Sequence, residues 1–411
     1  MRLKFFTIFS LIFAMSFTMI SPANAATMIP IKPVVEIPYT GNEQVSDLLL
    51  TTNSIALIGT TEAATSNPIP GNLGGASDGF ISIYAKSGSL LSSTRLGGSA
   101  NEIATAAALD ADGSIWIVGA STVVSGTTPA PTPTKLLNPD NVPLMPSAPI
   151  SSALTKLNLW QISSVGQLIN SYETQTAAVI SPQDLVMTKT GLVIFGDIYE
   201  GANVRGFYTS FNKTTLFTPI IRYGNKSTQL TEAIPNSDGS FTVVGRSSDL
   251  LLKSRAVTKS DAITLRISAT GSLQVVARAV LRNTSRGWSS IGAGLLQGGI
   301  VRYSNKTEAA VTKFSAINKP SWNTRYLSRS TALVATGTNS WVTFISAGAI
   351  PGLRTWKGKP AAPVLLQLGK KGELISAASF TGTPVAIARN NEMGTVVITD
   401  SGTSFGLLQV N

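Results

Sequence analysis

The side chains with the clearest potential for chemistry in this sequence are three closely spaced cations, Lys253, Arg255 and Lys259. Positive charges at this spacing in a polar segment can bind an anionic polymer or an acidic protein surface. A solvated basic surface without any ligand explains such a run equally well. The segment is therefore a candidate anion-binding site whose ligand stays open.

A second candidate binding segment surrounds a tryptophan in the polar stretch GLRTWKGKP. Three other tryptophans, Trp116, Trp160 and Trp341, fall in alternating β-type segments, where a large ring is expected to pack inside the molecule. The tryptophan at position 356 is instead expected in a long loop, so it is the best single candidate for a ligand contact. The residues proposed for this segment are Arg354, Trp356, Lys357 and Lys359.

Several familiar chemistries are excluded because the 411 residues contain no His and no Cys. A Ser-His-Asp or Cys-His nucleophile, a zinc site of the usual ligands and a disulfide all need one of these residues. Asp110, Asp112 and Asp238 could suggest fragments of a calcium loop, but their segments run directly into a strand instead of reaching a ligating Glu. We expect these aspartates in hairpin turns, and we expect no catalytic residue, metal or cofactor.

The N-terminal residues predict export of the chain. Arg2 and Lys4 precede an apolar stretch from Phe5 to Ile20, and Ala23-Asn24-Ala25 matches a signal-peptidase site. Residues 1–25 are therefore expected to be a signal peptide, with retention as an uncleaved anchor as the alternative. Residues 26–411 would form one secreted or surface-associated domain without a later transmembrane span.

Internal repeats predict the architecture of that domain. A tight turn followed by a β-rich run that often ends in Gly occurs seven times, as in DGSIWIVG (Asp112 to Gly119). A strand, a turn and another strand follow in six copies, and the seventh copy ends at SFGLLQVN (Ser404 to Asn411). Lys32 to Glu43 aligns with the fourth strand and loop at Leu90 to Glu102, so the N-terminus can complete the last unit. We predict an all-β, seven-bladed β-propeller of four-stranded antiparallel blades, closed by an N-terminal strand that joins the C-terminal blade.

The stretch Asp78 to Gly119, with DGF, SGSLLSSTRLGG, NE and DADGSIWIVG, resembles the β-propeller repeats of secreted bacterial proteins. The resemblance covers about one blade well and the other blades only by spacing and hydrophobic pattern. It implies the fold and export, and it carries no catalytic residue that could be transferred to this chain.

Loop lengths indicate which face of the propeller is functional. The connections between the second and third strands are long at Thr60 to Ser77, Ala120 to Ser151, Arg246 to Ser260 and Ala347 to Ala361. They should emerge on one face, and long loops on a rigid scaffold commonly carry binding specificity. The longest, a Pro-, Thr- and Ser-rich insert at about 120–151, can also be a neutral insertion.

The net charge of the chain is +11, and its charged residues are unevenly distributed along the sequence. Residues 26–200 contain 6 Lys and Arg against 13 Asp and Glu, whereas residues 201–330 contain 18 against 5. The basic sector should steer the molecule toward polyanions. Because export is predicted, an anionic polysaccharide, a cell-wall polymer or a protein partner is expected rather than intracellular nucleic acid.

Three functions remain open at this stage. The first is a non-enzymatic binding module that holds a polymer or protein on its loop-rich face. The second is a carbohydrate-active enzyme, a glycosidase or lyase, which would need a set of carboxylates in the central channel that the sequence does not reveal. The third is a structural or assembly module in which acidic and basic sectors of neighbouring molecules pair. The oligomeric state is left open.

Overall fold

The computed structural model describes residues 26–40, 42–64, 69–123, 153–317, 319–354 and 356–410. The predicted signal peptide at residues 1–25 lies outside this part, as does most of the long insert predicted at about 120–151. Within the described residues, no helix has the length and apolar character needed to cross a membrane.

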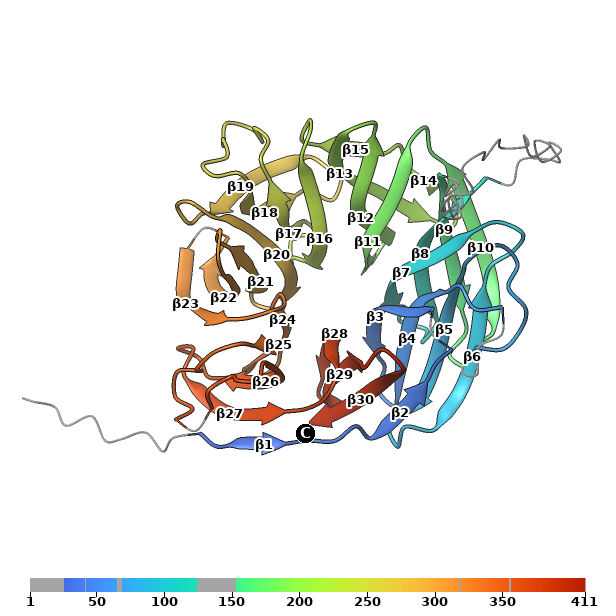
Figure 1. The fold of residues 1–411 in the computed structure, drawn as a ribbon. Coiled ribbons are helices and arrows are strands. Elements are labelled where there is room, and N and C mark those ends of the chain that lie inside the picture. The colour runs from blue at the N-terminus through green and yellow to red at the C-terminus, as the bar shows by residue number, and fades with distance from the viewer. Residues whose placement is uncertain are drawn as a thin grey trace, which may run out of the picture.

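The described residues form seven mainly antiparallel sheets, which are arranged as blades in a ring (Figure 1). The innermost strands line a central channel. We number the blades 1 to 7 from the sheet that begins with β3. The strands of each blade are given from the channel outward. Blade 1 contains β3 (Glu43–Leu50), β4 (Ser54–Thr61), β5 (Asp78–Ala85) and β6 (Leu90–Leu96), and blade 2 contains β7 (Glu102–Leu109), β8 (Ile115–Thr122), β9 (Leu154–Ile162) and β10 (Leu168–Gln175). Blade 3 contains β11 (Val179–Thr188), β12 (Gly191–Glu200), β13 (Asn203–Asn212), β14 (Leu216–Phe217) and β15 (Ile221–Tyr223), and blade 4 contains β16 (Thr228–Pro235), β17 (Phe241–Ser247), β18 (Asp261–Ile267) and β19 (Leu273–Ala279).

The remaining three blades follow the same plan, which confirms the predicted seven-bladed propeller. Their strands are β20 (Ser285–Gly292), β21 (Leu296–Arg302), β22 (Thr307–Ala316) and β23 (Lys319–Leu327); β24 (Leu333–Thr336), β25 (Ser340–Ser346), β26 (Ala362–Leu368), β27 (Leu374–Ser379) and β1 (Met28–Pro30); and β28 (Thr383–Asn390), β29 (Gly394–Asp400), β30 (Ser404–Val410) and β2 (Val35–Pro38).

The N-terminal segment closes the ring, as the sequence predicts. Strand β2 pairs antiparallel with β30, with Val35 opposite Leu407, and so supplies the missing fourth strand of blade 7. Strand β1 adds a feature that was not predicted, because it pairs in parallel with the outer strand β27 of blade 6, with Met28 opposite Ala377. The two short strands therefore fasten blades 6 and 7 to each other (Figure 1).

The outer strand of blade 3 departs from the predicted single strand. It is divided into β14 and β15, which both pair with β13. Pro219 lies between the two pieces. Proline has no N–H to donate to a strand ladder, which explains the interruption at this edge.

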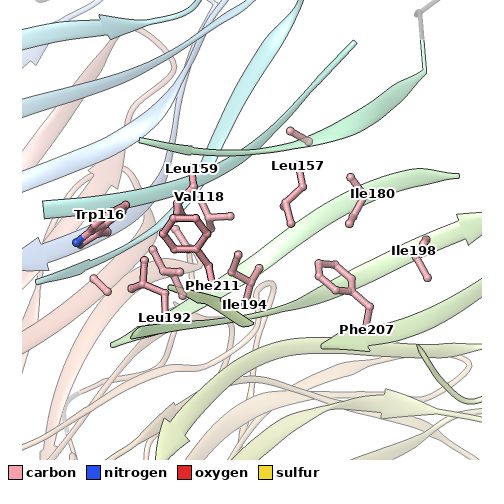
Figure 2. Close-up of a cluster of buried hydrophobic side chains, with 14 residues drawn as sticks. Trp116, Val118, Leu157, Leu159, Ile180, Leu192, Ile194, Ile198, Phe207 and Phe211 are labelled. Atoms are coloured by element: carbon pink, nitrogen blue, oxygen red, sulfur yellow. The ribbon is translucent and has the colours of Figure 1, made fainter. Parts of the chain in front are cut away.

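Apolar side chains that alternate along the strands fill the spaces between neighbouring blades. Between blades 2 and 3, Trp116 and Leu159 meet Ile194 and Phe207 in one buried cluster (Figure 2). Trp116, Trp160 and Trp341 are only 2%, 7% and 5% exposed, so the prediction that these rings belong to the core is confirmed.

The aspartates of the Asp-Gly segments lie in hairpin turns, as predicted. Asp112 accepts the N–H of Ser114 at 2.8 Å, and Asp238 accepts the N–H of Ser240 at 3.1 Å. The intervening Gly113 has φ 83°, a left-handed conformation that favours glycine. These carboxylates therefore stabilise the tight turns between the first two strands of blades 2 and 4.

Candidate functional site

The candidate binding residues of blade 4 lie in the connection between β17 and β18, residues 248–260, which we call the basic loop. Its first half folds into a tight turn in which Leu251 and Ser254 exchange backbone hydrogen bonds of 3.1 and 2.9 Å. Lys253, Arg255 and Lys259 are all exposed. The structure thus brings the three predicted cations together on one short, folded loop.

Two buried aspartates hold the ends of the basic loop. Asp249 accepts hydrogen bonds from the N–H of Ser227 at 2.9 Å and from the hydroxyl of Thr228 at 2.8 Å. These bonds tie the loop to the start of β16, the first strand of blade 4. Asp261, which is fully buried, accepts the N–H groups of Val257 at 2.8 Å and Thr258 at 3.1 Å. Both carboxylates therefore satisfy loop backbone groups that no strand can pair.

A buried arginine on β19 completes the support of the basic loop. The Arg278 guanidinium donates to the Ser254 Oγ at 3.1 Å and to the Ser247 carbonyl at 3.0 Å, and its Nη1 lies 3.5 Å from Asp261 Oδ2. Burial lowers the pKa of Arg278, and the Asp261 charge opposes this shift. Blade 1 repeats the pair at the same spacing, with Arg95 3.1 Å from Asp78. The sequence repeat therefore includes an ion pair that fastens this loop.

The loops between second and third strands lie on the face where the innermost strands begin. In blades 1 and 4 the last residue of this loop accepts a backbone N–H from the start of the next blade: Ser77 accepts that of Glu102 at 2.8 Å, and Ser260 accepts that of Arg286 at 2.9 Å. The candidate residues of blades 4 and 6 therefore share one face of the ring, with blade 5 between them (Figure 1).

The tryptophan of the blade 6 loop anchors that loop to the core. Trp356 is half-buried against a cluster that includes Ile350 and Leu353, and its Nε1 donates to Ser346 Oγ at 3.0 Å. The three cations proposed beside it are exposed, and they are Arg354, Lys357 and Lys359. In this loop the charged side chains are exposed, whereas the indole ring is partly covered by the core.

The central channel contains carboxyl groups that the sequence analysis did not identify. The innermost strands of all seven blades line a space of about 340 Å³. Asp47 of blade 1, Asp184 of blade 3 and Glu232 of blade 4 face this space. A signal for them exists in the sequence, because each carboxyl group follows one polar residue, in the pairs Ser-Asp, Gln-Asp and Thr-Glu at equivalent places of three repeats.

Each channel carboxyl group binds the backbone of the next blade. Asp47 accepts the N–H of Ala107 at 2.8 Å, Asp184 accepts that of Ala233 at 2.6 Å, and Glu232 accepts that of Ile291 at 2.8 Å. The innermost strand of a blade has no neighbouring strand on its channel side, so these N–H groups need another acceptor. The acids therefore connect consecutive blades around the channel.

The surroundings of the channel acids favour their protonated forms. Burial raises the pKa of Asp47 to about 6. Burial, together with the charge of Asp47, raises the pKa of Asp184 to about 7. Burial and the nearby Asp184 raise the pKa of Glu232 well above its usual value. Asp47 and Asp184 consequently change charge near neutral pH, which carboxyl groups in water do not.

A register shift in the innermost strand precedes each of the channel acids. The innermost strand contains a β-bulge just before Asp47, Asp184 and Glu232. The residue before each bulge pairs with the recurring glycine of the second strand, as Val45 does with Gly59. A Cβ at Gly59 would lie 2.0 Å from the Gln44 carbonyl oxygen, so only glycine permits this close approach. The repeated glycines and the bulges are therefore two parts of one structural feature.

Comparisons with known proteins assign no family to this chain. No protein-family model and no curated protein matches this chain. Similar solved structures include BamB from Moraxella catarrhalis, with 12% identity, a TM-score of 0.41 and coverage of 92% of this chain and 99% of that one. Another is BBS1N in complex with ARL6DN, with 9% identity, a TM-score of 0.48 and coverage of 94% and 98%. A third is the Hadza microbial sialidase Hz136, with 8% identity, a TM-score of 0.42 and coverage of 94% and 99%.

Proposed function

We propose that this chain is an exported, non-enzymatic binding module that holds an anionic polymer or an acidic protein surface on its loop-rich face. The basic loop of blade 4 is the proposed main contact, through Lys253, Arg255 and Lys259. The proposal includes cleavage of residues 1–25 as a signal peptide and a single propeller domain over residues 26–411. Arg354, Trp356, Lys357 and Lys359 of blade 6 form a second proposed contact on the same face.

The observation that carries this proposal is the rigid support of an exposed cationic loop. Asp249, Asp261 and Arg278 immobilise the backbone of the basic loop, while its three cations are exposed. A loop that is ordered before binding loses little conformational entropy when it meets a ligand. Its charges also attract an anionic partner before contact.

The contacts of the channel acids give no support to hydrolysis as the function. A glycosidase needs a general acid and a second carboxylate that can reach the substrate. Asp47, Asp184 and Glu232 instead accept backbone N–H groups of the following blades. Their position is thus explained by the stability of the ring, and we do not assign a catalytic role to them.

The proposal is tested by measuring the binding of residues 26–411 to a panel of acidic polysaccharides and acidic proteins at low and moderate salt. The triple variant K253A/R255A/K259A should weaken binding at least tenfold, and added salt should weaken binding of the unmodified protein. The matched control is K213A/K370A/K371A, which removes the same charge from exposed turns between third and fourth strands. Equal losses in both variants, or no binding to any member of the panel, would contradict the proposal.

A further inference from the structure

A groove between blades 4 and 5 lies directly beside the basic loop. Its volume is about 380 Å³. Its lining includes the apolar side chains of Leu281, Phe314 and Pro320 and the three arginines Arg278, Arg286 and Arg325. Among the described residues that line it there is no Asp or Glu. The groove therefore combines concentrated positive charge with an apolar surface.

Arg286 is the unusual member of this group because its charge is not compensated. Arg278 is paired with Asp261, and Arg325 Nη1 lies 3.2 Å from Glu308 Oε2. The Arg286 guanidinium lies over the Trp288 ring at 4.4 Å and has only a long contact of 3.4 Å with Thr312 Oγ1. In the described part of the chain, its buried Nε has no hydrogen-bond partner and no carboxylate forms an ion pair with it.

This charge persists at neutral pH. Burial, with a further contribution from the charge of Arg325, lowers the pKa of Arg286 to about 10. A group with that pKa is still protonated at pH 7. A half-buried positive charge with a buried, unsatisfied N–H is costly in the free protein, and an oxyanion that reaches it would relieve that cost.

The groove is continuous with the basic loop at both ends of that loop. Arg278 lines the groove and donates to Ser254 in the first half of the loop. The backbone N–H of Arg286 donates to the carbonyl of Ser260 at the end of the loop. A ligand that contacts the exposed lysines can therefore extend into the groove without leaving the cationic surface.

The outer edge of blade 4 favours a peptide as the occupant. Strand β19 forms one side of the groove and, within the described residues, pairs only with β18. In blade 6 the corresponding outer strand β27 binds an extended segment of this same chain, β1, through backbone pairing. An extended peptide can use such an edge, whereas a polysaccharide has no regular backbone N–H and C=O ladder.

We propose that the groove between blades 4 and 5 binds an extended acidic peptide segment of a partner protein. A carboxylate of the peptide pairs with Arg286, and an adjoining apolar side chain packs against Leu281, Phe314 and Pro320. This inference rests on the proposed binding function and names its partner as a peptide with acidic and apolar residues next to each other. Arg286 is then the residue that determines specificity, and the basic loop adds attraction of longer range.

The test uses residues 26–411 and an immobilised set of ten-residue peptides in which Asp or Glu adjoins Leu or Phe. Each acidic peptide is matched by its Asn or Gln counterpart, and polygalacturonate serves as the carbohydrate probe. We expect the acidic peptides to bind and R286Q to weaken that binding at least tenfold. R302Q, which changes an exposed arginine on β21 of the same blade, should leave binding unchanged.

The melting temperature separates a binding role of Arg286 from a structural one. If the half-buried charge of Arg286 is uncompensated, R286Q should melt at the same temperature as the unmodified protein or higher. A lower melting temperature together with unchanged peptide binding would overturn the proposal. If K253A/R255A/K259A weakens peptide binding and R286Q leaves it unchanged, the groove is refuted as the binding site and the proposed function stands. Binding of polygalacturonate alone would refute the peptide as the ligand class, and absence of binding to every probe would contradict both proposals.

Discussion

The three channel carboxyl groups link the stability of the protein to pH. Their pKa values are raised in the folded protein, to about 6 for Asp47 and about 7 for Asp184, whereas unfolded carboxyl groups titrate near 4. The folded state therefore binds protons more tightly than the unfolded state. This stabilising contribution is fully present below about pH 4 and is lost as the pH rises through 6 to 7.

We expect the melting temperature at pH 5.5 to exceed that at pH 8.0 by about 5 °C. The sequence has no His or Cys to titrate within this interval, and Asp197, whose pKa burial raises to about 6, contributes together with the channel acids. D184N should reduce this pH dependence, because Asp184 no longer titrates, whatever constant offset the new amide introduces. Calorimetry at the two pH values measures the effect, and D112N, at an exposed turn carboxylate, is the control. An unchanged pH dependence in D184N would show that the acid is not responsible.

The innermost strands, which position the channel acids, depend on the recurring glycine of the second strands. Gly59 faces the Gln44 carbonyl at a place where a Cβ would lie 2.0 Å from the oxygen, and Gly245 faces Gln229 in the same way. We expect G59A to lower the free energy of unfolding by about 2 kcal/mol, because the innermost strand must move away from its neighbour. G98A is the matched control, since its Cβ would lie no closer than 3.7 Å to another residue. Chemical denaturation compares the two, and equal stabilities would refute the close-approach explanation.

The strands and loops also show which features of the fold and of the candidate site can be predicted from the sequence alone. Alternating strands and recurring glycines predict the blades and the closure by β2, because period-two hydrophobicity and tight turns are local signals. The basic loop could also be predicted, because its three cations are close in sequence. The convergence of Asp47, Asp184 and Glu232 could not, because it arises only when separate blades meet at the channel. Strand β1 is too short to show a period, and it depends on the edge that β27 offers.

At the scale of the whole molecule, the N-terminal segment converts an open array of blades into a ring. Strand β2 covers the edge of β30, and its Ile37 is buried in a cluster with Phe405 and Leu407. Strand β1 binds only by a three-residue parallel pairing on the outside of blade 6. The two strands should therefore contribute very differently to stability, although they are neighbours in the sequence.

Two truncations separate these contributions. Deletion of residues 26–31 removes β1 and should lower the melting temperature only slightly, because few side chains lose burial. Deletion of residues 26–38 also removes β2, which exposes the edge of β30 and the apolar cluster around Phe405. We expect this variant to unfold at a much lower temperature, and we expect protease to cleave blade 7 before the other blades, since an uncovered strand edge and a lost interface leave that blade least protected. Thermal unfolding and limited proteolysis of both variants provide the measurement. If the longer deletion melted with the shorter one and showed no preferred cleavage in blade 7, closure of the ring by β2 would not be what holds the seven blades together.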